Sequence, residues 1–182
     1  EQIPSKRDAS IVFDIDATVL RMTPMEGEMV LTRIPMTKEI YDKALDLGIR
    51  VYFITARPDI VFSDGTTNSD VAQQQLAQLG FGEFTALYLM PRDTERTADG
   101  IAAYKRNARH NIITSGDDHP HFIALNIGDQ WTDIVGSSYM TPPGGRFEPS
   151  FSLEQLFKLE PSQIFYLTGP EPAVHRAIKM PE

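Results

Sequence analysis

Two aspartates that are separated by one residue follow a short apolar run near the beginning of the sequence. Asp14 comes directly after Ile-Val-Phe at residues 11–13, and Asp16 lies two positions further on. Because the run is apolar and rich in β-forming residues, it predicts a buried strand that ends at Asp14. Two carboxylates so close together repel each other at neutral pH unless a cation or a shared proton lies between them. A pair of solvated turn residues is the alternative, but a buried strand would deliver both carboxylates to one defined edge.

A second acidic pair follows a later apolar run at residues 122–127. Asp129 and Asp133 are four positions apart, and in a helix that begins here their side chains would face the same way. Carboxylates from two strand ends can converge on one hard cation, and oxygen ligands without His or Cys favour Mg²⁺ over Zn²⁺. Capping of the helix by Asp129, with Asp133 in its first turn, is the alternative. Capping and metal binding are compatible, so we predict a magnesium site.

Further positions could bind a phosphate group. Thr55 follows another apolar run, and a hydroxyl beside the backbone N–H groups of Ala56 and Arg57 could hold a phosphate oxygen. An acidic site that accepts a dianion also needs a cation besides the metal. Lys105 is one candidate, although on composition alone it belongs to a solvated helix face. Arg57 is the other candidate, because its guanidinium could clamp a phosphate with two N–H groups. Its alternative role is to pair with Asp59 at the surface.

The elements that must position these side chains alternate between strand and helix. Apolar runs predict strands at residues 11–13, 51–54, 86–89, 122–127 and 164–167. Helical spacing predicts a helix over residues 37–47 with Thr37 as N-cap, one over 71–79 capped by Ser69 or Asp70, and one from Thr97 or Asp99 to about Arg109. Gly48 and Gly80 are expected to end the first two. This alternation predicts an α/β fold with a Rossmann-like parallel sheet flanked by helices, and its ligand would lie beyond the carboxyl ends of the strands.

Four segments, taken in order, resemble the motifs of the haloacid dehalogenase (HAD) superfamily in its phosphatase branch. They are FDIDATVL, FITARPD, AAYKRNAR and NIGDQWTD. The superfamily has an Asp-x-Asp-x-Thr after the first strand, a Thr after the second, a Lys in a later helix and an acidic Gly-Asp-x-x-x-Asp motif. FITARPD and NIGDQWTD also resemble the acid phosphatase subgroup that includes class B bacterial acid phosphatases and plant vegetative storage proteins. The resemblance spans about residues 11–135. This sequence departs from the family pattern at Ala17, where a polar residue is more usual, and at Ala56, where Gly is more usual.

This resemblance implies catalytic roles for four residues. Asp14 would attack the phosphorus and form an aspartyl-phosphate, while Asp16 would protonate the leaving oxygen and then activate water. Thr55 and Lys105 would bind the transferring phosphoryl group. The expected substrate-binding residues are therefore Thr55, Ala56, Arg57 and Lys105.

The resemblance also implies Mg²⁺ as the cofactor. Its expected ligands are Asp14, the backbone carbonyl of Asp16, and Asp129, with Asp133 supporting the ion directly or through water. The implied architecture is a single HAD-type domain over residues 1–182 with a small cap insertion at about residues 21–36. Four methionines lie in that insertion, and they either line an adaptable pocket or fill a small lid core. They are Met22, Met25, Met29 and Met36.

Composition excludes several other classes of function. The net charge of −8 would repel a phosphate backbone, so no nucleic-acid partner is expected. The sequence has no cysteine, which excludes disulfides, thiolate metal sites and thiol catalysis. No apolar run approaches the roughly 20 residues that span a bilayer. Because the first residue is Glu1 rather than Met, a removed secretory signal is compatible with the sequence, and the compartment stays open between periplasm or secretion and the cytoplasm.

We therefore predict a magnesium-dependent phosphatase that hydrolyses small-molecule phosphate monoesters through an aspartyl-phosphate. A phosphotransferase that passes the phosphoryl group to an alcohol would use the same residues and is an open alternative. A storage or binding protein that kept the fold and lost turnover is another. Some relatives in the plant storage branch lack the nucleophile, whereas Asp14 is present here, which argues against that reading.

Overall fold

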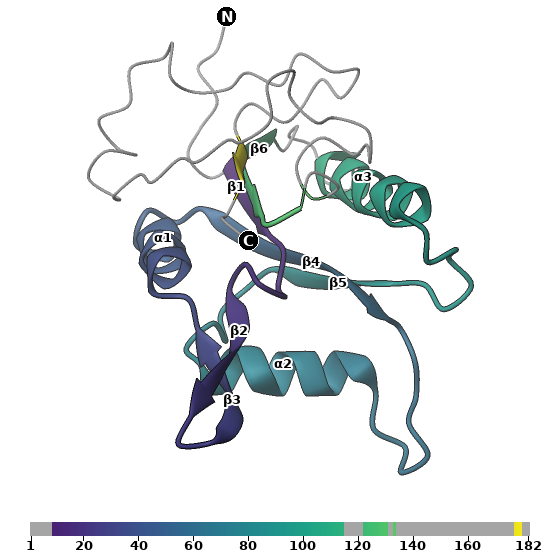
Figure 1. Ribbon diagram of the computed structural model, residues 1–182. Coiled ribbons are helices and arrows are strands. Elements are labelled where there is room, and N and C mark those ends of the chain that lie inside the picture. Colours follow the sequence, from purple (N-terminus) through teal and green to yellow (C-terminus); the bar gives the residue numbers. More distant parts are fainter. Residues whose placement is uncertain (1–8, 115–121, 131–132, 134–176, 180–182) are drawn as a thin grey trace, which may run out of the picture.

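The computed structural model describes residues 9–114, 122–130, 133 and 177–179 (Figure 1). The helices are α1 (Pro35–Asp46), α2 (Asn68–Gln78) and α3 (Ala98–Thr114). The strands are β1 (Ala9–Phe13), β2 (Leu20–Met25), β3 (Glu28–Arg33), β4 (Arg50–Pro58), β5 (Ala86–Met90), β6 (Phe122–Gly128) and β7 (Ala177–Lys179). From α1 to β6, helices and strands alternate as the sequence predicts.

β1 lies at the centre of a sheet whose strand order is β5-β4-β1-β6-β7. It pairs with β4 on one side, where Phe13 is opposite Phe53, and with β6 on the other, where Phe13 is opposite Ile127. Every pairing in this sheet is parallel, so the predicted α/β, Rossmann-like fold is confirmed. Because β4 and β6 flank β1, the residues at the carboxyl ends of these three strands lie close together at one edge of the sheet.

Different helices cover the two faces of the sheet. Successive side chains of a strand point to opposite faces. Phe13 therefore packs with Tyr41 of α1 and Leu76 of α2, whereas Val12 packs with Ile112 of α3. Figure 1 shows α3 on one side of the sheet, with α1 and α2 on the other. The result is a three-layer domain in which β1 is buried along its whole length.

The first two helices begin at residues that differ from the predicted caps. The prediction of Thr37 as N-cap is wrong, because α1 starts two residues earlier at Pro35 with Ile34 in the cap position. Proline suits the first helical position, since it has no N–H to leave unpaired and its φ is already helical. In α2, the cap is Thr67 rather than Ser69 or Asp70. Asp70 is instead the third residue of the helix and completes a capping box. Its carboxylate accepts a hydrogen bond from the backbone N–H of Thr67 over 2.8 Å.

Both predicted glycine ends are confirmed. Gly48 and Gly80 follow the C-caps of α1 and α2 with φ values of +68° and +91°, a conformation that glycine adopts without steric cost. α3 continues five residues past the predicted end at Arg109, because Ile112 extends the buried stripe of the helix. The predicted strand at residues 164–167 lies outside the described residues. In the described sheet, β7 occupies the outer position next to β6.

A β-hairpin that the sequence analysis missed lies between β1 and α1. β2 and β3 pair antiparallel from Leu20 opposite Arg33 to Met25 opposite Glu28. The loop residues Glu26 and Gly27 both have positive φ, at 51° and 87°, which is the geometry of a two-residue hairpin turn. The hairpin occupies most of the region expected to hold a cap, but the last two positions of that region, 35 and 36, belong to α1.

The methionines of the hairpin are exposed. Met22, Met25 and Met29 have relative exposures of 53%, 51% and 59%, so they do not form a packed lid core among the described residues. Figure 1 shows the hairpin projecting away from the main sheet. In the part of the chain that the structure covers, no helix combines the length and apolar character needed to cross a membrane.

Candidate active site

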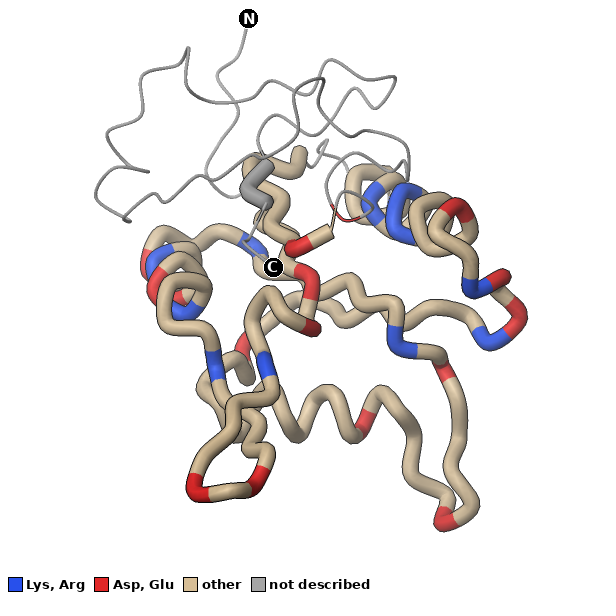
Figure 2. Tube along the Cα trace, in the orientation of Figure 1, with Lys and Arg blue, Asp and Glu red and all other residues tan. Residues whose placement is uncertain are grey.

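Three strand ends bring the predicted site residues to one edge of the sheet. Asp14 follows β1, Thr55 lies in β4, and Asp129 follows β6. The end of β1 is tied to its neighbour, because the backbone N–H of Asp14 donates to the carbonyl of Ile127 over 2.9 Å. Figure 2 shows acidic positions gathered where β1 and β6 end.

Asp14, Asp129 and Asp133 form a compact acidic triad. One carboxylate oxygen from each residue lies within 4.8 Å of the others, and all three residues are buried. Carboxylates so close together and so shielded from water need positive charge beside them. An all-oxygen set of this kind fits a hard cation such as Mg²⁺.

Lys105 of α3 supplies one positive charge to this triad. Its ammonium donates to Oδ1 of Asp14 over 2.6 Å and to Oδ1 of Asp133, and only 4% of the residue is exposed. The alternative of a solvated helix face is therefore wrong. Lys105 shares the buried stripe of α3 with Ala102 and Ile112, so the helix turns it toward the sheet. One ammonium beside three carboxylates still leaves negative charge that a divalent cation could neutralise.

The electrostatics of the triad reflect this crowding. Burial raises the pKa of the Asp14 carboxyl to about 7; the Lys105 ammonium opposes this rise and the Asp133 carboxylate adds to it. Burial also raises the pKa of Asp129. Burial lowers the pKa of Lys105, but the carboxylates of Asp14 and Asp133 raise it by more, so the net shift is upward. A divalent cation would favour the ionised form of the carboxyls and displace their protons.

Thr18 supports the triad although it was not predicted as a site residue. Its hydroxyl donates to Oδ2 of Asp14 over 3.2 Å and lies 3.4 Å from Oδ1 of Asp129. The residue is fully buried. Thr18 is the last residue of the Asp-x-Asp-x-Thr pattern, so the signal that could have identified it was present in the sequence.

Two side chains bind the backbone of Asp133, and a glycine leaves room for its carboxylate. The guanidinium of Arg109 donates to the carbonyl oxygen of Asp133 over 2.7 Å, and the side-chain amide of Asn126 donates to the same oxygen. At Gly128, an added Cβ would lie only 2.7 Å from Cγ of Asp133, so only glycine leaves room for this carboxylate. Arg109 carries no local sequence signal for this role, because its contact with Asp133 depends on the packing of α3 against β6. Asn126 lies in β6, seven positions before Asp133, and no motif marks its amide as a donor to that carbonyl.

The Asp16 carboxylate does not belong to the triad. Its side chain is 58% exposed and is bound by Arg57. Nε of Arg57 donates to Oδ2 over 2.9 Å, and NH2 donates to Oδ1 over 2.7 Å. The hydroxyl of Thr55 lies 3.4 Å from the same Oδ2. Arg57 thus pairs with Asp16 rather than with Asp59, and Ala56 lies between Thr55 and Arg57 as a half-buried residue of β4.

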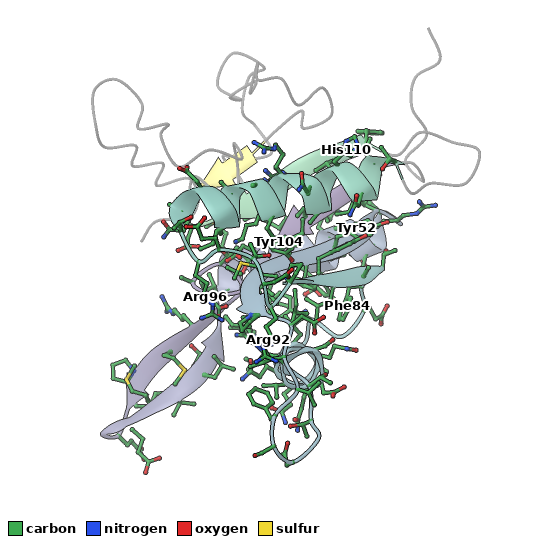
Figure 3. The ribbon with its side chains drawn as sticks, turned by 90° about the vertical axis from the view of Figure 1, so that its right-hand side faces the viewer. Tyr52, Phe84, Arg92, Arg96, Tyr104 and His110 are labelled. Carbon is green, nitrogen blue, oxygen red and sulfur yellow. The ribbon has the colours of Figure 1, made fainter. Side chains whose placement is uncertain are left out.

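A cavity of about 440 Å³ lies between β5 and α3, separate from the predicted site residues. Tyr88 of β5 and Tyr104 of α3 both line it, together with the amides of Asn107 and Asn111. Figure 3 shows Tyr104 between α3 and the strands. Burial raises the pKa of Tyr104, and the charge of Asp14 adds to this rise.

Residues 26–181 match the family model described as HAD superfamily, subfamily IIIB (Acid phosphatase). Three curated proteins are similar to the chain at low identity. Acid phosphatase 1 of Solanum lycopersicum is 25% identical over 146 residues, covering 70% of this chain and 52% of the relative. Vegetative storage protein 1 of Arabidopsis thaliana is 26% identical over 144 residues, covering 68% and 48% respectively. The Stem 31 kDa glycoprotein of Glycine max is 26% identical over 172 residues, covering 80% and 55%. The chain thus spans about half the length of these relatives.

Proposed function

This chain belongs to the acid phosphatase family of the HAD superfamily, subfamily IIIB, and we propose that it hydrolyses small-molecule phosphate monoesters with the help of Mg²⁺, through an aspartyl-phosphate formed on Asp14. The observation that carries the proposal is the contact between Asp14 and Lys105. A buried carboxylate at a strand end is held 2.6 Å from a buried ammonium, beside two further carboxylates that fit a hard cation. Phosphoryl transfer needs such positioning and charge neutralisation above all.

In the proposed reaction, Oδ of Asp14 attacks the phosphorus and the bond to the leaving oxygen breaks. Asp16 gives a proton to that oxygen, which leaves as an alcohol. Water then attacks the phosphorus of the aspartyl-phosphate, and Asp16 takes a proton from it. The bond to Asp14 breaks, which releases inorganic phosphate and restores the carboxylate of Asp14 and the protonated form of Asp16. Lys105 and Thr55 bind the oxygens of the phosphoryl group during both steps.

The metal would be held by the carboxylates of Asp14, Asp129 and Asp133, with the backbone carbonyl of Asp16 as a further proposed ligand. When bound, Mg²⁺ would neutralise negative charge on the phosphoryl oxygens. Thr18 supports this assignment, because its hydroxyl contacts two of the three carboxylates and restrains their rotation.

We further propose that residues 1–182 form one domain and that the β2–β3 hairpin is its small cap. The hairpin begins beside the site, since the backbone N–H of Ala17 donates to the carbonyl of Leu20 over 2.8 Å. A cap of two strands covers little of the site, which suits substrates of varied shape.

A storage role is the second candidate, and the similarity to a vegetative storage protein favours it. One assay separates the two. Purified protein is given an aryl phosphate with Mg²⁺ or with chelator, alongside Asp14→Asn. Hydrolysis that requires both Mg²⁺ and Asp14 supports the phosphatase. A folded chain that hydrolyses nothing supports storage. Product analysis with added alcohol detects phosphotransfer, the alternative that uses the same residues.

A further inference from the structure

We infer that Arg57 and Gln75 are positioning residues that hold the carboxylate of Asp16 at the mouth of the site. The inference rests on the proposed function, in which Asp16 transfers the proton. It adds two residues from separate elements, β4 and α2, whose task is to fix where that proton is delivered.

The contact between Arg57 and Asp16 uses both oxygens of the carboxylate. Nε donates to Oδ2 over 2.9 Å and NH2 donates to Oδ1 over 2.7 Å. Such a two-pronged pair fixes the plane of the carboxylate as well as its distance. Asp16 needs this restraint, because its side chain is 58% exposed and an exposed side chain otherwise samples several rotamers.

Gln75 fixes the guanidinium in turn. NH1 of Arg57 donates to Oε1 of Gln75 over 2.6 Å, so all three guanidinium nitrogens have partners on Asp16 or Gln75. Gln75 lies on α2 between two anchors, since Ala72 and Leu76 are fully buried in the core. The orientation of Arg57 is therefore set by a helix that is packed against the sheet.

β4 presents a second group to the same carboxylate. The buried hydroxyl of Thr55 lies 3.4 Å from Oδ2 of Asp16 and accepts from the backbone N–H of Arg57 over 3.2 Å. Asp16 is thus held at the end of β4, whereas Asp14 is held by Lys105 of α3. An in-line displacement places the attacking and leaving oxygens on opposite sides of phosphorus, so a proton donor must be held apart from the nucleophile. Arg57 and Gln75 hold Asp16 through contacts that are separate from the contact of Asp14 with Lys105.

This arrangement gives Arg57 a different task from the phosphate clamp predicted from the sequence. Its fork is engaged by Asp16, so binding a phosphate would require it to release the carboxylate. The two roles differ in what they affect. A phosphate clamp acts on every phosphate ligand equally, whereas a residue that positions a proton donor matters most when the leaving oxygen is strongly basic.

The test uses Gln75→Ala and Arg57→Lys, which keeps the charge and loses the fork. Gln74→Ala is the matched control, because Gln74 is the exposed neighbour of Gln75 on the same helix. For each variant, kcat/KM is measured with p-nitrophenyl phosphate, whose leaving group is good, and with a simple alkyl phosphate, whose leaving group is poor. The inhibition constant of inorganic phosphate is measured in parallel, and thermal unfolding reports on the fold.

We expect Gln75→Ala to lower kcat/KM for the alkyl phosphate about tenfold and Arg57→Lys to lower it about 100-fold, the lower end of what general acid catalysis supplies. The value for p-nitrophenyl phosphate should change less than about threefold, since a good leaving group needs little proton transfer. Phosphate inhibition and the Gln74→Ala variant should match the wild type.

Equal losses with both substrates, or weaker phosphate inhibition in Arg57→Lys, would overturn the inference in favour of a phosphate clamp. If Gln75→Ala behaves like Gln74→Ala, the role of Gln75 is overturned. A wild-type chain inactive on both substrates would instead overturn the proposed function itself.

Discussion

The ammonium of Lys105 lies 2.6 Å from a carboxylate oxygen of Asp14, although the two residues are 91 positions apart in the chain. Both side chains are almost completely buried. Their meeting depends on two independent placements. β1 delivers Asp14 to the edge of the sheet, and the buried stripe of α3 turns Lys105 toward that edge. A buried ion pair of this kind is costly to form and costly to break, so a functional role is a natural reason for it.

Asp14→Asn should abolish hydrolysis while the protein stays folded. The amide has almost the same shape as the carboxylate, but it is a poor nucleophile and a weaker metal ligand. We expect kcat for an aryl phosphate to fall by a factor of about 10³ or more, with a far-UV circular dichroism spectrum like that of the wild type. Retention of most of the activity would rule out covalent catalysis by Asp14.

Mg²⁺ should raise the thermal stability of the protein, because it binds the folded triad and not the unfolded chain. At a concentration 100 times its Kd, a single bound ion adds about 2.7 kcal/mol to the free energy of unfolding. Asp129→Asn should reduce the shift, since it removes one carboxylate of the triad. Differential scanning fluorimetry with and without chelator measures both. Full activity in metal-free protein would contradict the metal assignment.

Lys105→Met should lower the rate with an aryl phosphate by orders of magnitude and weaken the binding of vanadate. The substitution keeps the length of the side chain but leaves Asp14 and Asp133 without their ammonium partner. Breaking a buried pair from one side costs about 3–5 kcal/mol, so unfolding must be measured beside activity. Arg57→Met should affect this substrate less. The reverse ranking would show that Arg57, and not Lys105, is the cation for the phosphoryl group.

The metal-free protein should lose stability as the pH rises from about 4 to about 7. An aspartate side chain ordinarily has a pKa of 3.8, and burial raises the pKa of Asp14 to about 7 in the folded protein. Between these values the folded state holds a proton that the unfolded state has lost, so the free energy of unfolding falls as pH increases. One such group gives a slope of at most about 1.4 kcal/mol per pH unit.

Two comparisons isolate this effect. Asp14→Asn should show a shallower slope over the same pH range, because the titrating group is absent. Saturating Mg²⁺ should flatten the wild-type profile near neutral pH, because the ion favours the ionised carboxyl. Chemical denaturation at several pH values measures both. Identical slopes in the wild type and Asp14→Asn would contradict the raised pKa.

Much of the site could be predicted from local sequence because parallel strands place their carboxyl ends together. Short apolar runs were enough to locate the ends of β1 and β6, and with them Asp14 and Asp129. The burial of Lys105 could also have been predicted from the sequence. Counting the helical period from Ala102 to Ile112 places residue 105 on the buried stripe of α3, but the neighbouring charged residues obscured that period.

The pairing of Arg57 with Asp16 could not be predicted in the same way. β4 runs on to Pro58 instead of ending at residue 54, and its extension carries Arg57 past the end of the neighbouring β1. Which partner the guanidinium then finds depends on Gln75, which reaches it from α2. The hairpin was missed for a different reason. β2 contains Pro24, which is depleted in strands, and a Glu-Gly turn is a weaker hairpin signal than Asn-Gly or Asp-Gly.

The central position of β1 separates the dynamics of the site from those of the β2–β3 hairpin. β1 has a paired neighbour on each side and is buried throughout, so its amides should exchange with solvent only when the domain opens globally. Asp16, two residues further on, has an exposed side chain, but it lies in a turn that the buried residues Ile15, Thr18 and Val19 hold in place. The hairpin that follows has few buried side chains, so its tip should open locally at a much smaller free-energy cost. The proposed nucleophile and its partner in proton transfer would then keep their positions while the tip of the hairpin moves on a faster timescale, as a substrate enters or a product leaves.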